Sequence, residues 1–480
     1  MQNKHLYISK DCVNQQASNE TKGRIGMKQR MHTGLRMFVG IGLSAALLTA
    51  CGSGGGSGKS AGESPPGKEE AAPDITKQPA TVTFYNATAN EPQDLFMTKY
   101  GDIIAKKFPN YKINYVQAAK GTTLPELITA GTNNVDVIIA SIGETYKYVT
   151  SLELQDNISD LVTKYKFDMN RLEPSSVDIQ RKLSNGGIYG IPFSIATTVL
   201  YYNKDIFDMF AQPYPKDGMT WDDLYALTQK VTRSQNGVQY RGLTGAFTHL
   251  LRLNQSSAAI VDTKTNKSVF TEDKYKREFE NLLRFYKIPG NGLPGKAFNL
   301  QEQVDLFNKD QTSAMHLHLT RAAVSLWATT PNFNWDMVQQ PQWKDLPGVG
   351  PQSYPYYFYL TKTSKNRDAA FQVLAFAASD EFQQFMMKQG YMSALKDPSH
   401  LMKDLGTDVP GFKGKNLKAF LPAKYALSPE PYPFASLAEG ELNKAFAEVV
   451  VDGTDVNTAL RGAAERADKA IAAEVAKTAK

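Results

Sequence analysis

Residues 80–140 alternate between strand-like and helix-like patterns, and this alternation limits the fold more than any other feature of the chain. The strand-like segments are residues 81–86, 112–116 and 135–140, and the helix-like segments are residues 96–104 and 125–130. In the first strand Val82 and Phe84 share one face, while the third strand is apolar almost throughout, as in strands buried on both faces of a parallel sheet. Strand, helix, strand, helix, strand predicts an α/β layer structure.

The rest of the sequence adds helices and bounds the number of domains. Helices are predicted at residues 221–231 with Thr220 as cap, at 275–286, at 370–377, and from 455 towards the C-terminus. Cys12 and Cys51 are the two cysteines, so the body that follows has no thiol for a disulfide or a metal site. The stability of this body must therefore come from a hydrophobic core, and its length of roughly 400 residues predicts two domains.

Near the N-terminus, Cys51 directly follows a short apolar segment at residues 37–50. The segment is shorter than the ~20 residues that span a bilayer, and it follows basic residues, as in a secretory signal. The ending Leu-Thr-Ala-Cys at residues 48–51 resembles the lipobox of bacterial lipoproteins. This resemblance implies cleavage before Cys51 and a lipid on its sulfur. Met27 is a more natural start than Met1, which leaves open whether residues 1–26 belong to the signal.

The positive charge of the chain lies almost wholly in this N-terminal segment. The net charge is +6, and residues 1–50 carry +5 of it, with seven Lys or Arg against Asp11 and Glu20, which leaves +1. The basic balance therefore does not indicate a nucleic-acid-binding surface. Residues 52–79 are rich in Gly, Ser, Pro, Lys and Glu, a composition that predicts a flexible tether. The predicted location is the outer face of the cell membrane, more in keeping with a Gram-positive cell than with a periplasm.

Four segments in order resemble one known family. They are YGIPFSIATTVLYYNKDIF at residues 189–207, MTWDDL at 219–224, FNKDQTSAM at 307–315 and TKTSKNRDAAF at 361–371. They resemble the extracellular solute-binding lipoproteins of ABC importers, of the type that binds carbohydrates. One small departure is that Asp310 or Gln311 stands where the family has Gly. The resemblance covers the chain from about residue 80 to its end.

The resemblance implies a two-lobed α/β fold with three crossings between the lobes and a ligand cleft between them. It places the crossings near residues 194–198, 315–320 and 354–361. The expected parts are a signal at 1–50, a lipidated Cys51 and tether at 51–79, lobe 1 at 80–195, lobe 2 at 196–316, a return to lobe 1 at 317–355, and a return to lobe 2 with C-terminal helices at 356–480. The implied partners are a small solute, a permease in the membrane and the membrane itself through Cys51, for a protein that is otherwise a monomer.

A sugar site needs aromatic rings for the C–H faces of the sugar and polar side chains for its hydroxyl groups. Such groups gather where parallel strands end, at the lobe crossings and in neighbouring loops. The candidates are Asn86, Asn90, Ser141, Phe193, Ser194, His249, Asn254, Tyr354 and Tyr356, with Trp327, Trp335 and Trp343 as stacking platforms. Each aromatic residue has core packing as its alternative, and Asn86 has a turn. Asp136 and Asn203 are expected to bond nearby backbone and to cap a helix, respectively. No cofactor, metal or catalytic residue is expected.

Four other functions remain open on the sequence. Tyr201 and Tyr202 could serve a ferric-ion binder, although neighbouring strand residues face opposite ways. His316 and His318 share a strand face and could hold a metal, but no third ligand is evident. A secreted glycosidase with two carboxylates is a further alternative, although the sequence has no nucleophile elbow, zinc-protease motif or phosphate loop. The same fold could also serve as a ligand sensor coupled to a membrane kinase.

Overall fold

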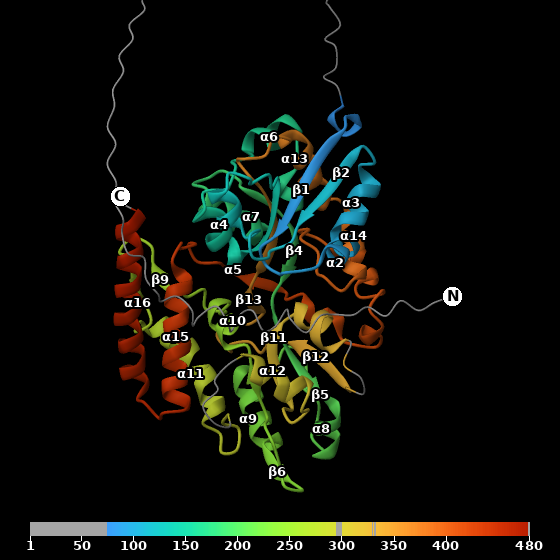
Figure 1. Cartoon of the computed structure of the whole chain (residues 1–480). Coiled ribbons are helices and arrows are strands. Elements are labelled where there is room, and N and C mark those ends of the chain that lie inside the picture. Colours follow the sequence, from blue (N-terminus) through green and yellow to red (C-terminus); the bar gives the residue numbers. More distant parts are fainter. Residues whose placement is uncertain (1–73, 294–299, 329, 331–332, 479–480) are drawn as a thin grey trace, which may run out of the picture. The chain divides into compact units, whose positions relative to one another are not determined.

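Two separate β-sheets organise the chain in this computed structural model, which describes residues 74–293, 300–328, 330 and 333–478 (Figure 1). Residues 75–480 form one compact unit. The predicted signal, Cys51 and most of the predicted tether lie outside the described residues. None of the described helices is both long and apolar enough to cross a membrane.

The first sheet has five strands in the order β2-β1-β3-β14-β4. Its strands are β1 (Ala80–Asn86), β2 (Tyr111–Val116), β3 (Val137–Ser141), β4 (Gly190–Ala196) and β14 (Tyr354–Leu360). β1 pairs in parallel with β2 and β3, and β14 pairs antiparallel with β3 and β4. Val82 and Phe84 are buried on the same face in one core cluster, as their alternation predicts. This sheet and the helices around it form lobe 1.

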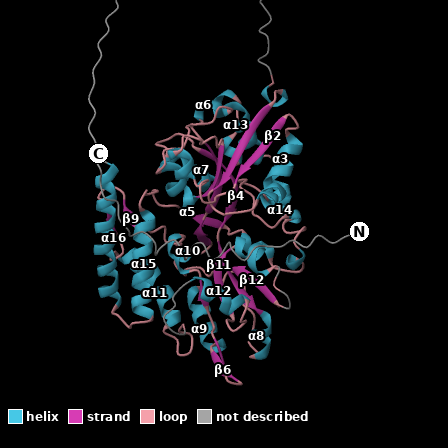
Figure 2. Cartoon of the chain, viewed as in Figure 1, coloured by secondary structure: helices cyan, strands magenta, loops and turns pink. Residues whose placement is uncertain are grey.

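The second sheet has four strands in the order β12-β5-β11-β8. Its strands are β5 (Thr198–Asn203), β8 (Thr244–Gly245), β11 (Met315–Leu319) and β12 (Trp335–Gln339). β5 pairs antiparallel with β11 and β12, and β8 pairs in parallel with β11. This sheet anchors lobe 2, and Figure 2 shows both sheets in magenta with cyan helices around them.

Helices cover both sheets. In lobe 1 they are α2 (Gln93–Phe96), η2 (Met97–Gly101), α3 (Asp102–Lys107), α4 (Leu124–Thr129), α5 (Ile142–Thr145), η3 (Tyr146–Thr150), α6 (Ser159–Lys164), α7 (Pro174–Leu183), α13 (Arg367–Ala377) and α14 (Asp380–Lys388), with the short turns η1 (Ile75–Lys77) and η4 (Met169–Arg171). In lobe 2 they are α8 (Lys204–Met209), α9 (Trp221–Val231), α10 (Phe247–Arg252), α11 (Asp273–Tyr286), α12 (Leu300–Asn308), η5 (Ala323–Trp327), α15 (Ala435–Val450) and α16 (Val456–Thr478). α15 and α16, red in Figure 1, pack along each other and share a core cluster with α9, α10 and α11.

The smaller elements complete the chain. They are β6 (Arg233–Gln235) with β7 (Val238–Tyr240), β9 (Val261–Asp262) with β10 (Lys267–Ser268), β13 (Val349–Gln352) with β15 (Lys424–Ala426), and the turns η6 (Ser399–Asp404), η7 (Pro410–Phe412) and η8 (Leu417–Phe420). Several local expectations hold: Thr220 caps α9 in a capping box with Asp223, and the side chain of Asn203 caps α8. The Asp136 carboxylate accepts a hydrogen bond from the Thr83 backbone N–H at 2.8 Å.

The chain passes between the two sheets three times. Two of the passages lie at predicted places, near residues 194–198 and next to residues 354–361, and the remaining one does not. The first joins β4 to β5 at Thr197, as predicted, and the second joins β13 to β14 at Ser353. The third follows α14, after which Phe412 and Phe420 pack in a core cluster of lobe 2. The predicted crossing at residues 315–320 is wrong because β11 and β12 both pair with β5.

The placement of residues 317–355 in lobe 1 and of residues 356–480 in lobe 2 therefore needs correction. β12 lies within the first range and belongs to the lobe 2 sheet, while most of β14 lies within the second range and belongs to the lobe 1 sheet. α13 packs on β4 and β14, so it also belongs to lobe 1. The physical reason is backbone pairing: hydrogen bonds to β5 and β3 decide which sheet each strand joins.

Candidate functional site

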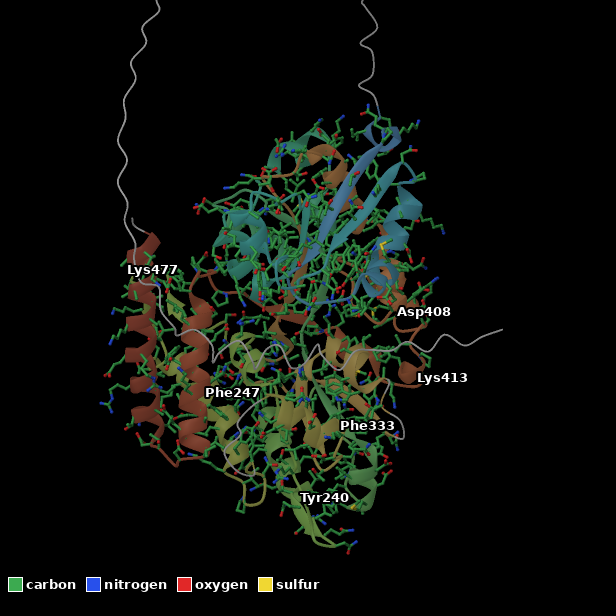
Figure 3. All side chains as sticks on the ribbon, in the orientation of Figure 1. Tyr240, Phe247, Phe333, Asp408, Lys413 and Lys477 are labelled. Atoms are coloured by element: carbon green, nitrogen blue, oxygen red, sulfur yellow. The ribbon has the colours of Figure 1, made fainter. Side chains whose placement is uncertain are left out.

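A group of aromatic and basic side chains from both lobes meets next to the lobe crossings. We call this group the interlobe belt; it consists of Tyr354, Tyr356, His249, His316, His318, Arg321 and Trp327. The ring centroids of Tyr354 and Tyr356 lie 5.6 Å apart, and that of His249 lies 5.9 Å from Tyr354. Figure 3 draws the described side chains, and the labelled Phe247 marks the start of α10, which carries His249.

The histidines extend the belt into lobe 2. The His249 and His318 rings lie 5.7 Å apart, and the His316 and His318 rings lie 5.5 Å apart. Trp327 closes the row, with its ring 6.0 Å from that of His318. Alternation along β11 explains the arrangement, because Met315 and Leu317 point into the core on the other face of the strand.

A chain of hydrogen bonds crosses the belt between the lobes. The hydroxyl groups of Ser141 and Tyr354 lie 3.2 Å apart, and Arg252 donates from Nη1 to the Tyr354 hydroxyl at 3.3 Å. Arg252 also forms a two-point ion pair with Glu439, in which Nε donates to Oε1 at 2.6 Å. A Cβ on Gly143 would lie 2.2 Å from the Tyr354 hydroxyl and 2.5 Å from Arg252 Nη1, so a larger residue there would displace these two side-chain ends. Arg252 thus ties β14 of lobe 1 to α15 of lobe 2.

Arg321 follows β11 and reaches from lobe 2 to tyrosines of lobe 1. Its guanidinium carbon lies 3.9 Å from the ring centre of Tyr356 and 4.6 Å from that of Tyr391. Burial opposes the charge of Arg321, but Tyr356, Tyr100 and Tyr391 outweigh burial, and the net pKa is raised. Arg321 is therefore a permanent cation against aromatic rings, an arrangement in which the ring faces stabilise the charge.

Four belt residues carry buried polar atoms without a hydrogen-bond partner among the described residues. The atoms are His249 Nδ1, His316 Nε2, Arg321 Nη1 and Trp327 Nε1. Buried polar atoms in proteins are paired in the great majority of cases, and exceptions tend to have a functional reason. His316 and Trp327 are fully buried, and Trp327 belongs to the lobe 2 core cluster, whereas Tyr354, Tyr356 and His318 keep a little exposure. The exposed edges of these rings suit a ligand that has both apolar faces and hydroxyl groups.

Comparison with protein families identifies the chain. The model of the bacterial extracellular solute-binding protein family matches residues 87–384, more than half of the sequence. The chain belongs to this family. The resemblance drawn from the sequence motifs is thereby confirmed.

Solved structures support the fold of this solute-binding protein. A sugar transporter of Rhizobium etli, solved in an open conformation, has a TM-score of 0.65 at 22% identity, over 81% of this chain and 98% of that chain. An ABC substrate-binding protein of Listeria monocytogenes, solved with cycloalternan, has a TM-score of 0.64 at 18% identity, over 82% of this chain and 100% of that chain. At these identities the likeness confirms the two-lobed α/β fold.

A curated relative matches a smaller part of the solute-binding protein. The arabinooligosaccharide-binding protein of Bacillus subtilis (strain 168) is 24% identical over 199 residues, which is 39% of this chain. The match spans 45% of the length of that relative.

The structure brings several of the predicted site residues together. Ser141, His249, Trp327, Tyr354 and Tyr356 all lie in the belt or bond to it. Asn90 has a buried Oδ1 without a partner among the described residues. Contact of these residues with a solute stays a prediction.

Four other predicted contacts serve the fold in this structure. Phe193 is fully buried in the lobe 1 core, with its ring 4.4 Å from that of Phe358. Asn86 closes a turn, because its Oδ1 accepts from the N–H of Thr88 at 3.0 Å, and this is the alternative that the sequence left open. Ser194 donates to a backbone carbonyl at 2.9 Å. The side-chain amide of Asn254 donates to the carbonyls of Leu251 and Ala258, and it accepts from the Ala258 N–H.

The two further tryptophans and the tyrosine pair also belong to cores. Trp335 is buried in a lobe 2 cluster, and Trp343 packs against another lobe 2 cluster and donates to Glu278 at 3.0 Å. Tyr201 and Tyr202 face opposite sides of β5 and enter different clusters, as their neighbouring positions predict. Among the described residues, no group of three or more His, Cys, Asp or Glu side chains is arranged to hold a metal ion.

Sequence reasoning missed Arg252 and Arg321. Arg321 comes two residues after the end of β11, and Arg252 ends α10 between the predicted His249 and Asn254. The rule that polar residues gather at strand ends and in neighbouring loops would have included both. Arginine is normally exposed in proteins, and the partial burial of these two arginines between the lobes is visible only in the folded structure.

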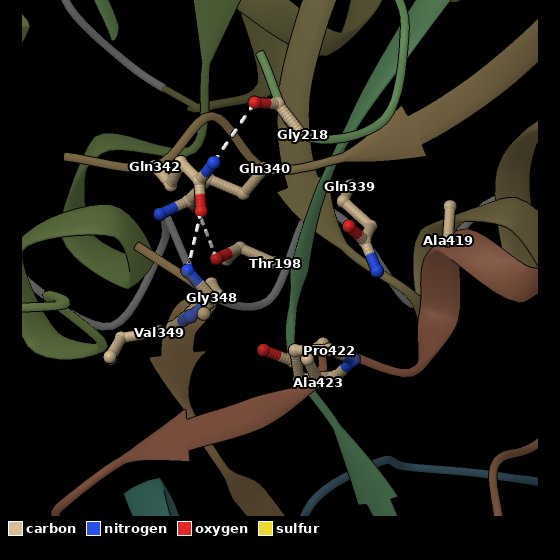
Figure 4. Close-up of a pocket in the computed structure, with 13 residues that line it drawn as sticks. Thr198, Gly218, Gln339, Gln340, Gln342, Gly348, Val349, Ala419, Pro422 and Ala423 are labelled. Carbon is tan, nitrogen blue, oxygen red and sulfur yellow. Dashed lines mark hydrogen bonds between the residues drawn. The ribbon is translucent and has the colours of Figure 1, made fainter. Parts of the chain in front are cut away.

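A separate pocket lies at the back of the lobe crossing. Figure 4 shows it between β5, β12 and β13, with Thr198, Gln340 and Gln342 among its lining residues. Gln342 donates to the Gly218 carbonyl at 3.0 Å and accepts from the Gly348 N–H at 2.7 Å. The pocket has a volume of about 40 Å³, which suits a few water molecules and excludes a sugar ring.

We predict that the belt histidines reduce stability in mild acid. Burial lowers the pKa of His318 to about 4, whereas an unfolded chain has about 6.5. Between these values only the unfolded chain binds the proton, so the free energy of unfolding falls with falling pH by about 1.4 kcal/mol per pH unit for this group. Urea unfolding between pH values of about 7 and 4.5 should show a shallower fall in His318→Gln than in the native protein.

The matched control is His400, whose side chain is 51% exposed. The same measurement on His400→Gln shows what the removal of an exposed histidine does to the dependence on pH. Equal slopes for the native protein and His318→Gln would show that His318 does not resist protonation in the folded state.

Proposed function

We propose that this solute-binding protein captures a sugar or an oligosaccharide between its lobes and delivers it to an ABC permease at the outer face of the membrane. The observation that carries the proposal is the interlobe belt, where the tyrosine rings of lobe 1 meet histidine rings and unpaired polar atoms of lobe 2. Rings stack on the C–H faces of a sugar, and the unpaired nitrogen atoms can bond its hydroxyl groups. The names of the relatives agree, since they are a sugar transporter, a protein solved with cycloalternan and an arabinooligosaccharide-binding protein.

Binding requires movement of the lobes, because the belt side chains pack against one another here. Tyr354 and Tyr356 are each 5% exposed and His318 is 8% exposed. A sugar can reach them only after the lobes separate about the crossings at Thr197 and Ser353. The bound sugar then favours closure by touching both lobes, and the closed form is the species that a permease can recognise.

The function is binding without chemical change, and thermal unfolding tests it. Residues 59–480, which contain the whole compact unit, are heated with and without members of a panel of mono- and oligosaccharides. A specific ligand at 100 times its dissociation constant should stabilise the protein by about 2.7 kcal/mol. The proposal requires a shift with one class of sugar and recovery of that sugar intact. Recovery of cleaved sugar would indicate a glycosidase, and no shift with any sugar would refute sugar binding.

We also propose that Cys51 holds the protein at the membrane through a lipid. The support is the sequence order of basic residues, apolar segment and lipobox that ends at Cys51. The Cys51→Ala protein, expressed in a Gram-positive host, should move from the membrane fraction to the medium or remain as unprocessed precursor. Cys12→Ala is the matched control and should stay in the membrane fraction as mature protein. Mature Cys51→Ala protein in the membrane fraction would refute the lipid anchor.

A further inference from the structure

Arg321 is a cation of the belt that has no carboxylate partner among the described residues. Two neighbouring cations have one: Arg252 pairs with Glu439, and Lys99 pairs with Glu91. The ion pairs of the described residues do not include Arg321, and its side-chain neighbours are the uncharged tyrosines Tyr356, Tyr100 and Tyr391. Glu144 interacts with Lys147 and Arg252.

The surroundings of Arg321 leave part of its guanidinium available to a ligand. Tyr356 and Tyr391 lie against the group at 3.9 and 4.6 Å from its central carbon. Nη1 is buried and makes no hydrogen bond to the described residues. Arg321 is only partly buried, so water and the aromatic rings both stabilise its charge, but Nη1 itself is shielded from water and unpaired. An anion bound in the cleft would supply the missing partner.

We propose that the solute is an acidic saccharide, a uronic acid or an oligosaccharide of uronic acids, whose carboxylate pairs with Arg321. This inference rests on the proposed function and narrows it, since a neutral sugar has no group that neutralises Arg321. A guanidinium binds a carboxylate through two parallel N–H···O bonds, which matches an edge that is still free beside two rings. Each uronate residue carries one negative charge, which suits the one unpaired cation among the described belt residues, whereas a phosphate ester carries nearly two on one group.

The remaining belt groups fit the same ligand. Uronic acids keep the apolar ring faces that Tyr354 and Tyr356 can cover, and they keep hydroxyl groups for His249, which is partly exposed. The carboxylate replaces only the exocyclic CH₂OH group of the neutral sugar. Neutral and acidic sugars of one stereochemistry therefore differ at one position, which makes them matched probes.

The test is calorimetric titration of residues 59–480 with matched pairs of disaccharides. The pairs are digalacturonate and galactobiose, a glucuronate disaccharide and cellobiose, and a mannuronate disaccharide and mannobiose, with galactose 6-sulfate as an anionic sugar that has no carboxylate. One acidic sugar should bind at least about tenfold more tightly than its neutral counterpart, and added salt should weaken that binding. The Arg321→Gln protein should lose about ten- to a hundredfold in affinity for the acidic sugar and little for the neutral one.

Two variants act as controls. Arg461→Gln removes the same charge from an exposed position on α16 and should bind like the native protein. Arg321→Lys keeps the charge and should regain part of the preference for the acidic sugar. If the Arg321→Gln protein does not fold, Arg321→Lys takes its place in the comparison with the native protein. Thermal unfolding without ligand shows which variants are folded.

The outcomes separate this inference from the proposed function. Tighter binding of neutral sugars, with equal affinities in native and Arg321→Gln protein, would leave sugar binding in place and overturn the acidic ligand. A preference for the sulfated sugar over every uronate would support the anion site and overturn the carboxylate. Failure of all sugars to bind would overturn both proposals.

Discussion

The Phe193→Ala protein is expected to unfold with a free energy about 3–5 kcal/mol lower than the native protein. Phe193 is fully buried in β4, and its ring packs on Phe358 at 4.4 Å and on Tyr100 at 5.7 Å. Alanine would leave a cavity at the centre of the lobe 1 core, and the flanking strand pairs restrict how far the core can collapse into it. Urea unfolding measures the change.

Affinity for the solute should change little in the Phe193→Ala protein under conditions in which it is folded. The control is Leu427→Ala, because Leu427 is 71% exposed, and its expected effect on stability is within about 0.5 kcal/mol. Loss of solute affinity together with native stability would show that Phe193 is a contact residue and that its packing role is misjudged.

The Glu439→Gln protein is expected to lose about 3 kcal/mol of stability, because the change leaves the guanidinium of Arg252 without its carboxylate. The two side chains are 9% and 23% exposed, so water screens the pair only in part. Urea unfolding of this variant is compared with that of Glu381→Gln. Glu381 is 50% exposed and pairs with Lys107 at the surface, and its loss should cost at most about 0.5 kcal/mol.

A double variant separates the pair from its surroundings. Removing both charges, as in Arg252→Met with Glu439→Met, should cost less than Glu439→Gln alone, because no charge is then left unpaired. A double variant less stable than the sum of its single changes would contradict this account of the ion pair.

Local sequence patterns predicted the helices and strands well, because the spacing of apolar residues within one element shows which of its faces is buried. The alternation of Val82 and Phe84 identified β1, and the capping pair of Thr220 and Asp223 identified the start of α9. The order of the lobes was harder to predict. β12 and β14 are both apolar strands, and their sequences do not say that one pairs with β5 and the other with β3. Such pairing depends on residues more than a hundred positions away.

The candidate site was predicted in part for a similar reason. Strand ends and lobe crossings located Ser141, Tyr354 and Tyr356, which lie beside lobe 2 in the structure. The same rule selected Phe193, although alternation along β4 directs its ring into the core. The two arginines were missed because only the tertiary structure shows that Arg252 has a carboxylate partner and that Arg321 lacks one among the described residues.

Hydrogen exchange with and without a bound saccharide tests most directly whether the solute lies between the lobes on the belt. The account predicts slower exchange on binding in peptides from both lobes, covering residues 249–252, 316–327 and 354–357. α16 lies apart from the belt and should exchange at an unchanged rate. Protection confined to one lobe, or centred on the pocket of Thr198 and Gln342, would contradict a site at the interlobe belt.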